Sequence, residues 1–308
     1  MADIWDTPKQ DWDANDAIGY DDLNRIESNA SALRYGTYRR VQGFGYTVDN
    51  TVSGQDGVIT VTPGSAFTNN GVPFRMTANH TKNLTTWVQG NGATFGGMAP
   101  GVTPAAWTWY YIYAIYNQTS GATEIMFDSD PAGGNVSSVT YTEKRWIGTF
   151  KTAAAGGDGS FDLCIAYSTG DTVFFDPNSF VPAAGYITIT QANPTPLNTF
   201  ELKTLTAPTV GLLLPPYEVT AKLNINTQEG AIALYNYHFP IPSQVRNGTV
   251  WYGEHSDRDF QASTPDRYAG DIDIIVSPAG QLYVGMWNTG APATAYIRVR
   301  GFYQDRRF

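Results

Sequence analysis

The densest group of side chains able to do acid–base or metal chemistry lies in the segment WYGEHSDRDF. Within six residues it contains Glu254, His255, Asp257 and Asp259. On a β-strand the last three would share one face, where they could bind a divalent cation or transfer a proton. An exposed loop whose acids pair with Arg258 and Arg267 is the favoured interpretation, because a metal or acid–base role needs convergent partners that the sequence does not show. We therefore predict no catalytic residue and no metal site here.

Two glycine-containing segments resemble ligand-binding loops only superficially. DSDPAGGN, Asp128 to Asn135, has the acidic content of a calcium loop but lacks the alternating oxygen ligands and closing Glu of an EF-hand, so a hairpin turn is predicted. GTFKTAAAGGDGS lacks the Lys-Ser/Thr that directly follows the glycines of a phosphate-binding loop, and no G-x-S-x-G occurs in the chain. The sequence therefore predicts no cofactor and no enzyme. One enzymatic alternative stays open, a polysaccharide depolymerase with two carboxylates.

Aromatic side chains of the C-terminal part form a candidate binding surface. Exposed Trp and Tyr stack on sugar rings and anchor interfaces, because each has a large apolar face and a polar edge. The predicted glycan-binding rim consists of Trp251, Tyr252, Tyr283, Trp287 and Tyr296. The alternative is that members such as Tyr283 and Met286 fill a core, since aromatic residues are mostly buried.

Composition restricts the class of protein. Of 308 residues 15% are charged and 14% aromatic, which disfavours disorder. The net charge of −9 would repel phosphate backbones, so no nucleic-acid partner is expected. The lone Cys164, in the apolar run FDLCIAY, predicts a buried strand thiol. We expect synthesis in the cytoplasm without a signal peptide and no membrane insertion, because the N-terminus lacks an apolar core and YYIYAIY and VGLLLPPY are short.

The elements that would position these residues are almost all strands. Short runs alternate between apolar and polar residues and are separated by turn formers such as Pro63-Gly64 and Asn69-Asn70-Gly71. The run AAWTWYYIYAIYN is apolar on both faces, which predicts a strand that is covered on both sides or lines a subunit interface. We therefore predict a mainly β chain with a short N-terminal α-helix followed by β-sandwich-like domains. The expected segments are 1–38, a β-rich domain at 39–194 and a C-terminal β-sandwich at 195–308.

The exception is YDDLNRIESNASALRYG, residues 20–36, which has helical spacing. Its apolar seam consists of Leu23, Ile26, Ala30 and Leu33. Such a narrow stripe is typical of a helix that pairs with another chain, and a helix of about 14 residues is marginal in water by itself. Packing on its own β domain is the alternative. We predict an oligomerisation or attachment element.

The order of motifs over roughly residues 12–217 resembles that of tailed-bacteriophage virion proteins of the tail-fibre or baseplate-appendage kind. The motifs are W…YDDLNRIESN, then GVITVTPGSAFTNNGVPFRMT, then WYYIYAIYN…IMFDSDP…YTEKRWIGTFKTAAAGGDGSF, and finally STGDTVFF and LLLPPYEV. The chain departs from the pattern at Arg145-Trp146, where the family has paired Arg and then an aliphatic residue. A second departure is the AAAGG insertion before Asp158.

This resemblance implies a structural virion component, a homotrimer anchored by its N-terminus to other tail or baseplate proteins and contacting the host surface. A head fibre or decoration protein fits the sequence as well. A receptor-binding protein that recognises host glycan and a depolymerase are the further alternatives. The resemblance says nothing of the last ninety residues.

Overall fold

The computed structural model describes residues 41–50, 57–89, 96–136, 140–155, 161–164, 166–169, 171–175, 187–191, 201–207, 211–228, 231–235, 259–260, 268–287, 293–304 and 306. The prediction of a mainly β chain is confirmed, since all regular elements over these ranges are strands. The predicted helix at 20–36, with Leu23, Ile26, Ala30 and Leu33, lies outside the described residues. Over the described part, no helix is long and apolar enough to span a bilayer.

The strands of the first half are β1 (Gln42–Gly43), β2 (Tyr46–Asp49), β3 (Val58–Val61), β4 (Gly64–Phe67), β5 (Pro73–Met76), β6 (His80–Lys82), β7 (Trp109–Tyr116), β8 (Thr123–Asp128), β9 (Glu143–Ala155), β10 (Phe161–Leu163), β11 (Ala166–Thr169) and β12 (Thr172–Phe175). Those of the second half are β13 (Ile187–Gln191), β14 (Glu201–Thr204), β15 (Thr206–Ala207), β16 (Gly211–Leu212), β17 (Val219–Gln228), β18 (Ala231–Tyr235), β19 (Asp259–Phe260), β20 (Tyr268–Val276), β21 (Gln281–Trp287) and β22 (Ala293–Tyr303).

These strands pair antiparallel in several sheets. A four-stranded sheet has the order β10-β9-β7-β8, and a three-stranded sheet the order β1-β4-β5. A nine-stranded sheet runs β20-β17-β22-β12-β11-β2-β3-β6, with β13 also paired to β22. A four-stranded sheet, β14-β21-β18-β19, and the small β15-β16 pair complete the arrangement.

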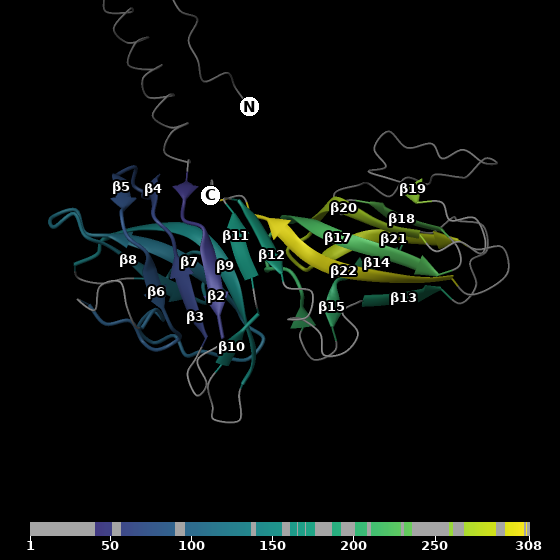
Figure 1. The fold of residues 1–308 in the computed structure, drawn as a ribbon, viewed down its shortest axis with the longest axis horizontal. Coiled ribbons are helices and arrows are strands. Elements are labelled where there is room, and N and C mark those ends of the chain that lie inside the picture. The colour runs from purple at the N-terminus through teal and green to yellow at the C-terminus, as the bar shows by residue number, and fades with distance from the viewer. Residues whose placement is uncertain are drawn as a thin grey trace, which may run out of the picture.

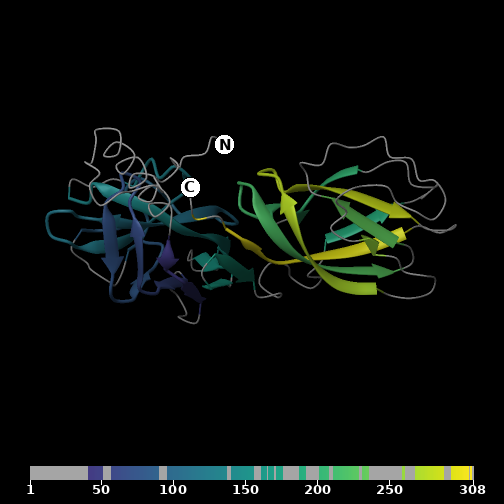
Figure 2. The same cartoon turned by 90° about the horizontal axis from the view of Figure 1, so that it is seen from above.

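The long strand β22 joins the two groups of strands seen in Figures 1 and 2. Along most of its length it pairs with β17, and at its C-terminal end Tyr303, Phe302 and Gly301 also pair with β12. The strand β13, which precedes the predicted boundary at residue 194, pairs with β22 as well. The division of the chain into three segments remains a prediction, and β22 shows that its last strand contacts both groups.

Period-two burial explains why these sequences form sheets. On β17 the buried residues alternate with half-buried polar ones: Val219, Ala221, Leu223 and Ile225 are buried, and Thr220, Lys222 and Asn224 are half-buried. The inward side chains of β20, β21 and β22 join the same hydrophobic cluster, which extends into the first group of strands. Strand β7 is buried on both faces, as predicted, because Ile112 packs in this cluster and Tyr113 in a second one. Cys164 is buried, as predicted, but it directly follows β10 and does not lie in a strand.

The segment Asp128 to Asn135 is not a hairpin turn, contrary to the prediction. Strand β7 lies between β8 and β9, so the segment passes over the Tyr113 side chain of β7 instead of connecting paired strands. The Asp128 carboxylate accepts hydrogen bonds from the backbone N–H of Asp130 (3.0 Å) and of Asn135 (2.9 Å). The Asp130 carboxylate accepts from the N–H of Ala132 (2.9 Å) and Gly134 (3.0 Å). The acidic residues therefore hold the loop through its own backbone.

A buried ammonium group makes stability depend on pH. Lys151 is 1% exposed, and its Nζ donates to the carbonyl of Leu212. Burial lowers the pKa of Lys151 from 10.5 to about 8, so between these values the unfolded chain binds more protons and stability rises with pH. Burial raises the pKa of the Cys164 thiol from 9.0 to about 12, which opposes the rise above pH 9.

We expect the wild type to gain about 1 kcal/mol of unfolding free energy between pH 8 and 9 relative to Lys151→Met. Urea unfolding of both proteins at these two pH values measures the difference. Lys222→Met serves as a control, because the Lys222 pKa is raised and its ammonium stays charged over this interval. Parallel pH profiles for wild type and Lys151→Met would contradict the assignment.

Candidate functional site

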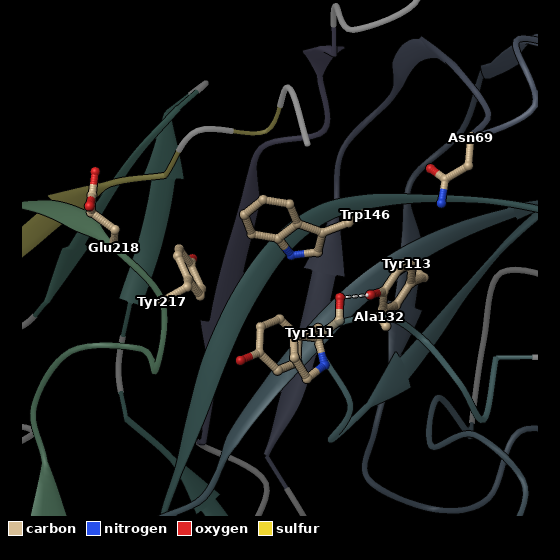
Figure 3. Close-up of a pocket in the computed structure, with 8 residues that line it drawn as sticks. Asn69, Tyr111, Tyr113, Ala132, Trp146, Tyr217 and Glu218 are labelled. Carbon is tan, nitrogen blue, oxygen red and sulfur yellow. Dashed lines mark hydrogen bonds between the residues drawn. The ribbon is translucent and has the colours of Figure 1, made fainter. Parts of the chain in front are cut away.

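The described residues enclose a pocket where the β7–β9 sheet meets the segment that leads into β17. Its volume is about 490 Å³. It is lined by Asn69, Tyr111, Tyr113, Pro131, Ala132, Trp146, Tyr217 and Glu218. Figure 3 shows Tyr111, Trp146 and Tyr217 around one space, with Asn69 and Glu218 at opposite ends. Pockets where two structural blocks meet are common ligand sites.

Strands β7 and β9 supply the floor and one wall. Tyr111 and Tyr113 are two residues apart on β7, so they share a face, and each is 2% exposed. Trp146 pairs with Tyr113 across the strands and therefore lies on that face too. The indole N–H of Trp146 donates to the carbonyl of Gly148 (2.7 Å), which fixes the ring orientation.

Tyr217 supplies the second wall from the C-terminal part of the chain. Its ring lies 5.3 Å from that of Trp146, at an interplanar angle of 82°, and 6.1 Å from that of Tyr111. Its hydroxyl is hydrogen-bonded to the Thr149 hydroxyl (2.8 Å) on β9. Trp146 and Tyr217 therefore form a nearly right-angled aromatic corner above the buried tyrosines.

The loop between β8 and β9 closes one side of the pocket. Tyr113 donates its hydroxyl hydrogen to the carbonyl of Pro131 (2.5 Å). Gly133 has φ +66°, and a Cβ there would lie 2.8 Å from Cζ of Tyr113. Only glycine allows both this backbone conformation and this close approach. The loop can therefore pack directly on the Tyr113 ring.

The electrostatic environment of the pocket is acidic. Burial and, secondly, the Asp130 charge raise the pKa of Tyr111 to about 12. Burial and the charges of Asp128 and Asp130 raise the pKa of Tyr113 further. The Tyr111 hydroxyl is buried and has no hydrogen-bond partner among the described residues. Glu218 adds an exposed carboxylate to the lining.

This lining is suited to binding. Hydrolysis of a glycoside needs two carboxylates on opposite sides of the bond, and Glu218 is the one carboxylate among the described residues that line the pocket. The tyrosine hydroxyls are held protonated at neutral pH. Within the described ranges, no group of three His, Cys, Asp or Glu residues is placed to hold a metal ion. The pocket combines aromatic walls with polar groups at its ends, a composition that is common in recognition sites.

The predicted glycan-binding rim is described only in part. Tyr283 on β21 pairs with Leu202 and is half-buried, beside the buried Leu282 and Val284. Tyr296 on β22 is half-buried beside the buried Ile297. The two tyrosines belong to different sheets, each on the face opposite to its buried neighbours, so the structure does not bring them together.

The other members of the rim have no described side-chain position. Trp287 lies at the end of β21, paired with Ala231. Trp251 and Tyr252 lie outside the described residues, as do Glu254, His255 and Asp257. Asp259 begins β19 and pairs with Ala233. Recognition of a glycan by the five aromatic residues therefore stays a prediction.

The sequence reasoning missed this pocket, although its residues lie in motifs already singled out. Tyr111 and Tyr113 belong to the Tyr-rich run, Trp146 to YTEKRWIGTF, and Tyr217 and Glu218 to LLLPPYEV. These residues are far apart in the sequence, so the sequence does not show that they come together in one pocket. The available signal was Trp146, an aromatic residue in the dipeptide where the chain departs from the motif that it otherwise resembles.

Comparison with known proteins identifies no family. No family model and no curated protein matches the chain. The structural neighbours include particles derived from infectious bursal virus, at 10% identity and a TM-score of 0.16, covering 87% of this chain and 70% of that one. The Gx strain of infectious bursal disease virus matches at 11% identity and a TM-score of 0.13, covering 85% and 74%. Likeness at this level carries no argument about fold or function.

Proposed function

We propose that this chain is a non-enzymatic structural component of a tailed-phage virion, of the tail-fibre or baseplate-appendage type, which also binds a ligand in its aromatic pocket. The virion part rests on the resemblance of motif order in the sequence. The binding part rests on one observation, the aromatic corner of Trp146 and Tyr217 above the buried Tyr111 and Tyr113. The β-sandwich-like arrangement of the C-terminal strands belongs to this proposal, as does localisation in the virion.

Ligand binding makes a receptor-binding role the second candidate. A receptor-binding protein needs a specific surface, and the pocket supplies a recessed one where the β7–β9 sheet meets the segment that leads into β17. Labelling of the intact particle distinguishes a head fibre from a tail fibre, because the label would then lie on the head and not on the tail. A depolymerase would make halos on a bacterial lawn. Its chemistry would require a second carboxylate close to Glu218.

The trimer is tested by light scattering on the purified protein, with and without residues 1–36. We expect a mass of about three times 33.6 kDa for the full chain and dissociation on truncation. A trimer that survives truncation would move self-association into the β domains. A monomer in both forms would refute the trimer.

Substitutions in the predicted helix test the same point without removing chain. Leu23→Asp plus Ile26→Asp places two charges in the apolar seam and should abolish assembly while the β domains stay folded. Asn24→Asp plus Ser28→Asp adds the same charge outside the seam and should leave the trimer intact. Equal behaviour of the two variants would restrict the helix to local packing.

A further inference from the structure

Strand β6 places an imidazole and an ammonium on the core side of its sheet. His80 and Lys82 are 7% and 0% exposed, and Thr81 between them is half-buried, so the two basic side chains share one face. In the pairing with β3, His80 lies opposite Val61 and Lys82 lies opposite Ile59. Both of these partners are fully buried in the main hydrophobic cluster. The face that carries the two basic groups is therefore the face that packs on the core.

The two basic groups differ in their partners. Nζ of Lys82 lies 3.7 Å from the carboxylate of Glu124 on β8. That carboxylate also accepts hydrogen bonds from the indole N–H of Trp87 (2.7 Å) and the hydroxyl of Tyr141 (3.0 Å). Nδ1 of His80 is buried and has no hydrogen-bond partner in the part of the chain that the structure describes. Because a protonated imidazole donates from both nitrogens, a proton on His80 would add a buried charge without an acceptor at Nδ1.

The surroundings of His80 favour its neutral form. Burial, as the larger cause, and the charge of Lys82 lower the pKa of His80 from its ordinary value of 6.5. The charge of Glu124 acts in the opposite direction and does not overcome the other two. In a strand that has opened to water the imidazole regains its ordinary pKa. The stability that His80 gives to the closed strand is therefore complete above about pH 6.5 and is lost as the pH falls below this value.

The position of β6 in the sheet determines what yields when His80 binds a proton. The strand is three residues long and ends the nine-stranded sheet, in which β3 is its neighbour. A short strand at a sheet edge has few backbone hydrogen bonds to lose, so it opens at lower cost than a central strand such as β17. Opening gives the charged imidazole access to water, and it leaves backbone N–H and C=O groups of β3 unpaired.

We propose that β6 is an acid-sensitive edge of the nine-stranded sheet, and that protonation of His80 releases this strand from β3 while the central strands stay paired. The released edge of β3 can then pair with another strand, from a second copy of the chain or from a partner. This device depends on neither the aromatic pocket nor the virion assignment, so it goes beyond the function proposed above.

Hydrogen–deuterium exchange of the full chain, followed by mass spectrometry of its peptides at pH 7.5 and 5.5, tests the proposal. Each rate is divided by the rate of the unstructured peptide at the same pH. Peptides that cover β3 and β6 should lose protection several-fold at pH 5.5, up to about tenfold, because each pH unit below the ordinary pKa favours the protonated open form by at most that factor. Peptides that cover β17 and β22 should keep their protection, since carboxylates ordinarily titrate below this interval.

Histidine variants assign the effect to one residue. His80→Gln keeps a polar side chain that does not titrate, and His80→Leu places an apolar side chain of similar size against Val61. Both should show the same protection of β3 and β6 at the two pH values. The chain contains two other histidines, so the double variant His238→Gln plus His255→Gln is the matched control and should keep the acid response of the wild type.

Each contrary result overturns the proposal. Protection of β3 and β6 that is the same at pH 7.5 and 5.5 would show that His80 does not control the edge. An equal loss of protection in β17 and β22 would indicate unfolding of the whole sheet instead of release of one strand. An acid response that survives in His80→Gln and His80→Leu, or that disappears in the double variant, would assign the effect to another group.

Discussion

Arg306→Ala should lower the free energy of unfolding by about 2–4 kcal/mol, because it removes a buried guanidinium that connects three parts of the chain. Arg306 is 3% exposed. Its Nε donates to the Asp171 carboxylate (2.7 Å), and its Nη1 to the carbonyls of Gly43 (2.9 Å) and Ile147 (3.3 Å). Its own carbonyl accepts from Nη2 of Arg145 (2.6 Å).

The cost arises mainly from the groups left behind. Removal of the guanidinium leaves the buried carbonyl of Ile147 and the partly buried carbonyl of Gly43 without this donor, and a buried group left unpaired costs about 1–3 kcal/mol. The salt bridge itself contributes less, because the Asp171 side chain is 64% exposed and water screens it. Since Arg306 follows β22, we expect the variant to loosen the contact between this strand and the first group of strands.

Urea unfolding of Arg306→Ala and Arg300→Ala measures the effect. Arg300 lies on β22 with its side chain 53% exposed, 3.8 Å from Asp271, so its loss should change stability by less than about 0.5 kcal/mol. Arg306→Lys should fall between the wild type and Arg306→Ala, because an ammonium reaches fewer acceptors than a guanidinium. Equal losses for the two alanine variants would show that Arg306 does not connect the groups.

The sequence predicts the strands well because their pattern is local. Alternation of Val219, Ala221 and Leu223 with polar residues identifies β17 without any knowledge of its neighbours. The two-sided Tyr-rich run is likewise visible as a strand with no solvent face. What the pattern cannot give is the order of strands in a sheet. The expectation of a hairpin at Asp128 was wrong for this reason, since β8 and β9 are adjacent in sequence yet separated by β7.

The pocket illustrates the same limit for function. Tyr111 and Trp146 come together through the pairing of β7 with β9, and Tyr217 joins them from the segment before β17. A short stretch of sequence contains neither of these contacts. The content of aromatic residues predicted a binding surface in the C-terminal part of the chain instead. There Tyr283 and Tyr296 lie on different sheets. Buried polar groups escape the sequence for a related reason, because their partners come from distant segments.

Glu124 is the clearest of these groups, and its replacement by Ala should cost about 3–5 kcal/mol, among the largest single effects in the chain. Its side chain is 5% exposed and lies 3.7 Å from Nζ of Lys82, which is fully buried. Its carboxylate oxygens accept hydrogen bonds from the indole N–H of Trp87 (2.7 Å) and the hydroxyl of Tyr141 (3.0 Å). Truncation leaves a buried ammonium without its counter-ion and removes the acceptor of both aromatic donors.

A double variant distinguishes the ion pair from simple loss of packing. Glu124→Leu with Lys82→Met replaces both charges by apolar groups of similar size, so no charge remains uncompensated, and such replacements of buried pairs are often neutral. We expect the double variant to be more stable than Glu124→Ala by about 2 kcal/mol, because both variants leave the two aromatic donors without their acceptor and only Glu124→Ala also leaves Lys82 without its carboxylate. If the double variant is as unstable as Glu124→Ala, the energy lies in the Trp87 and Tyr141 hydrogen bonds. The stranded charge of Lys82 would then not be its source.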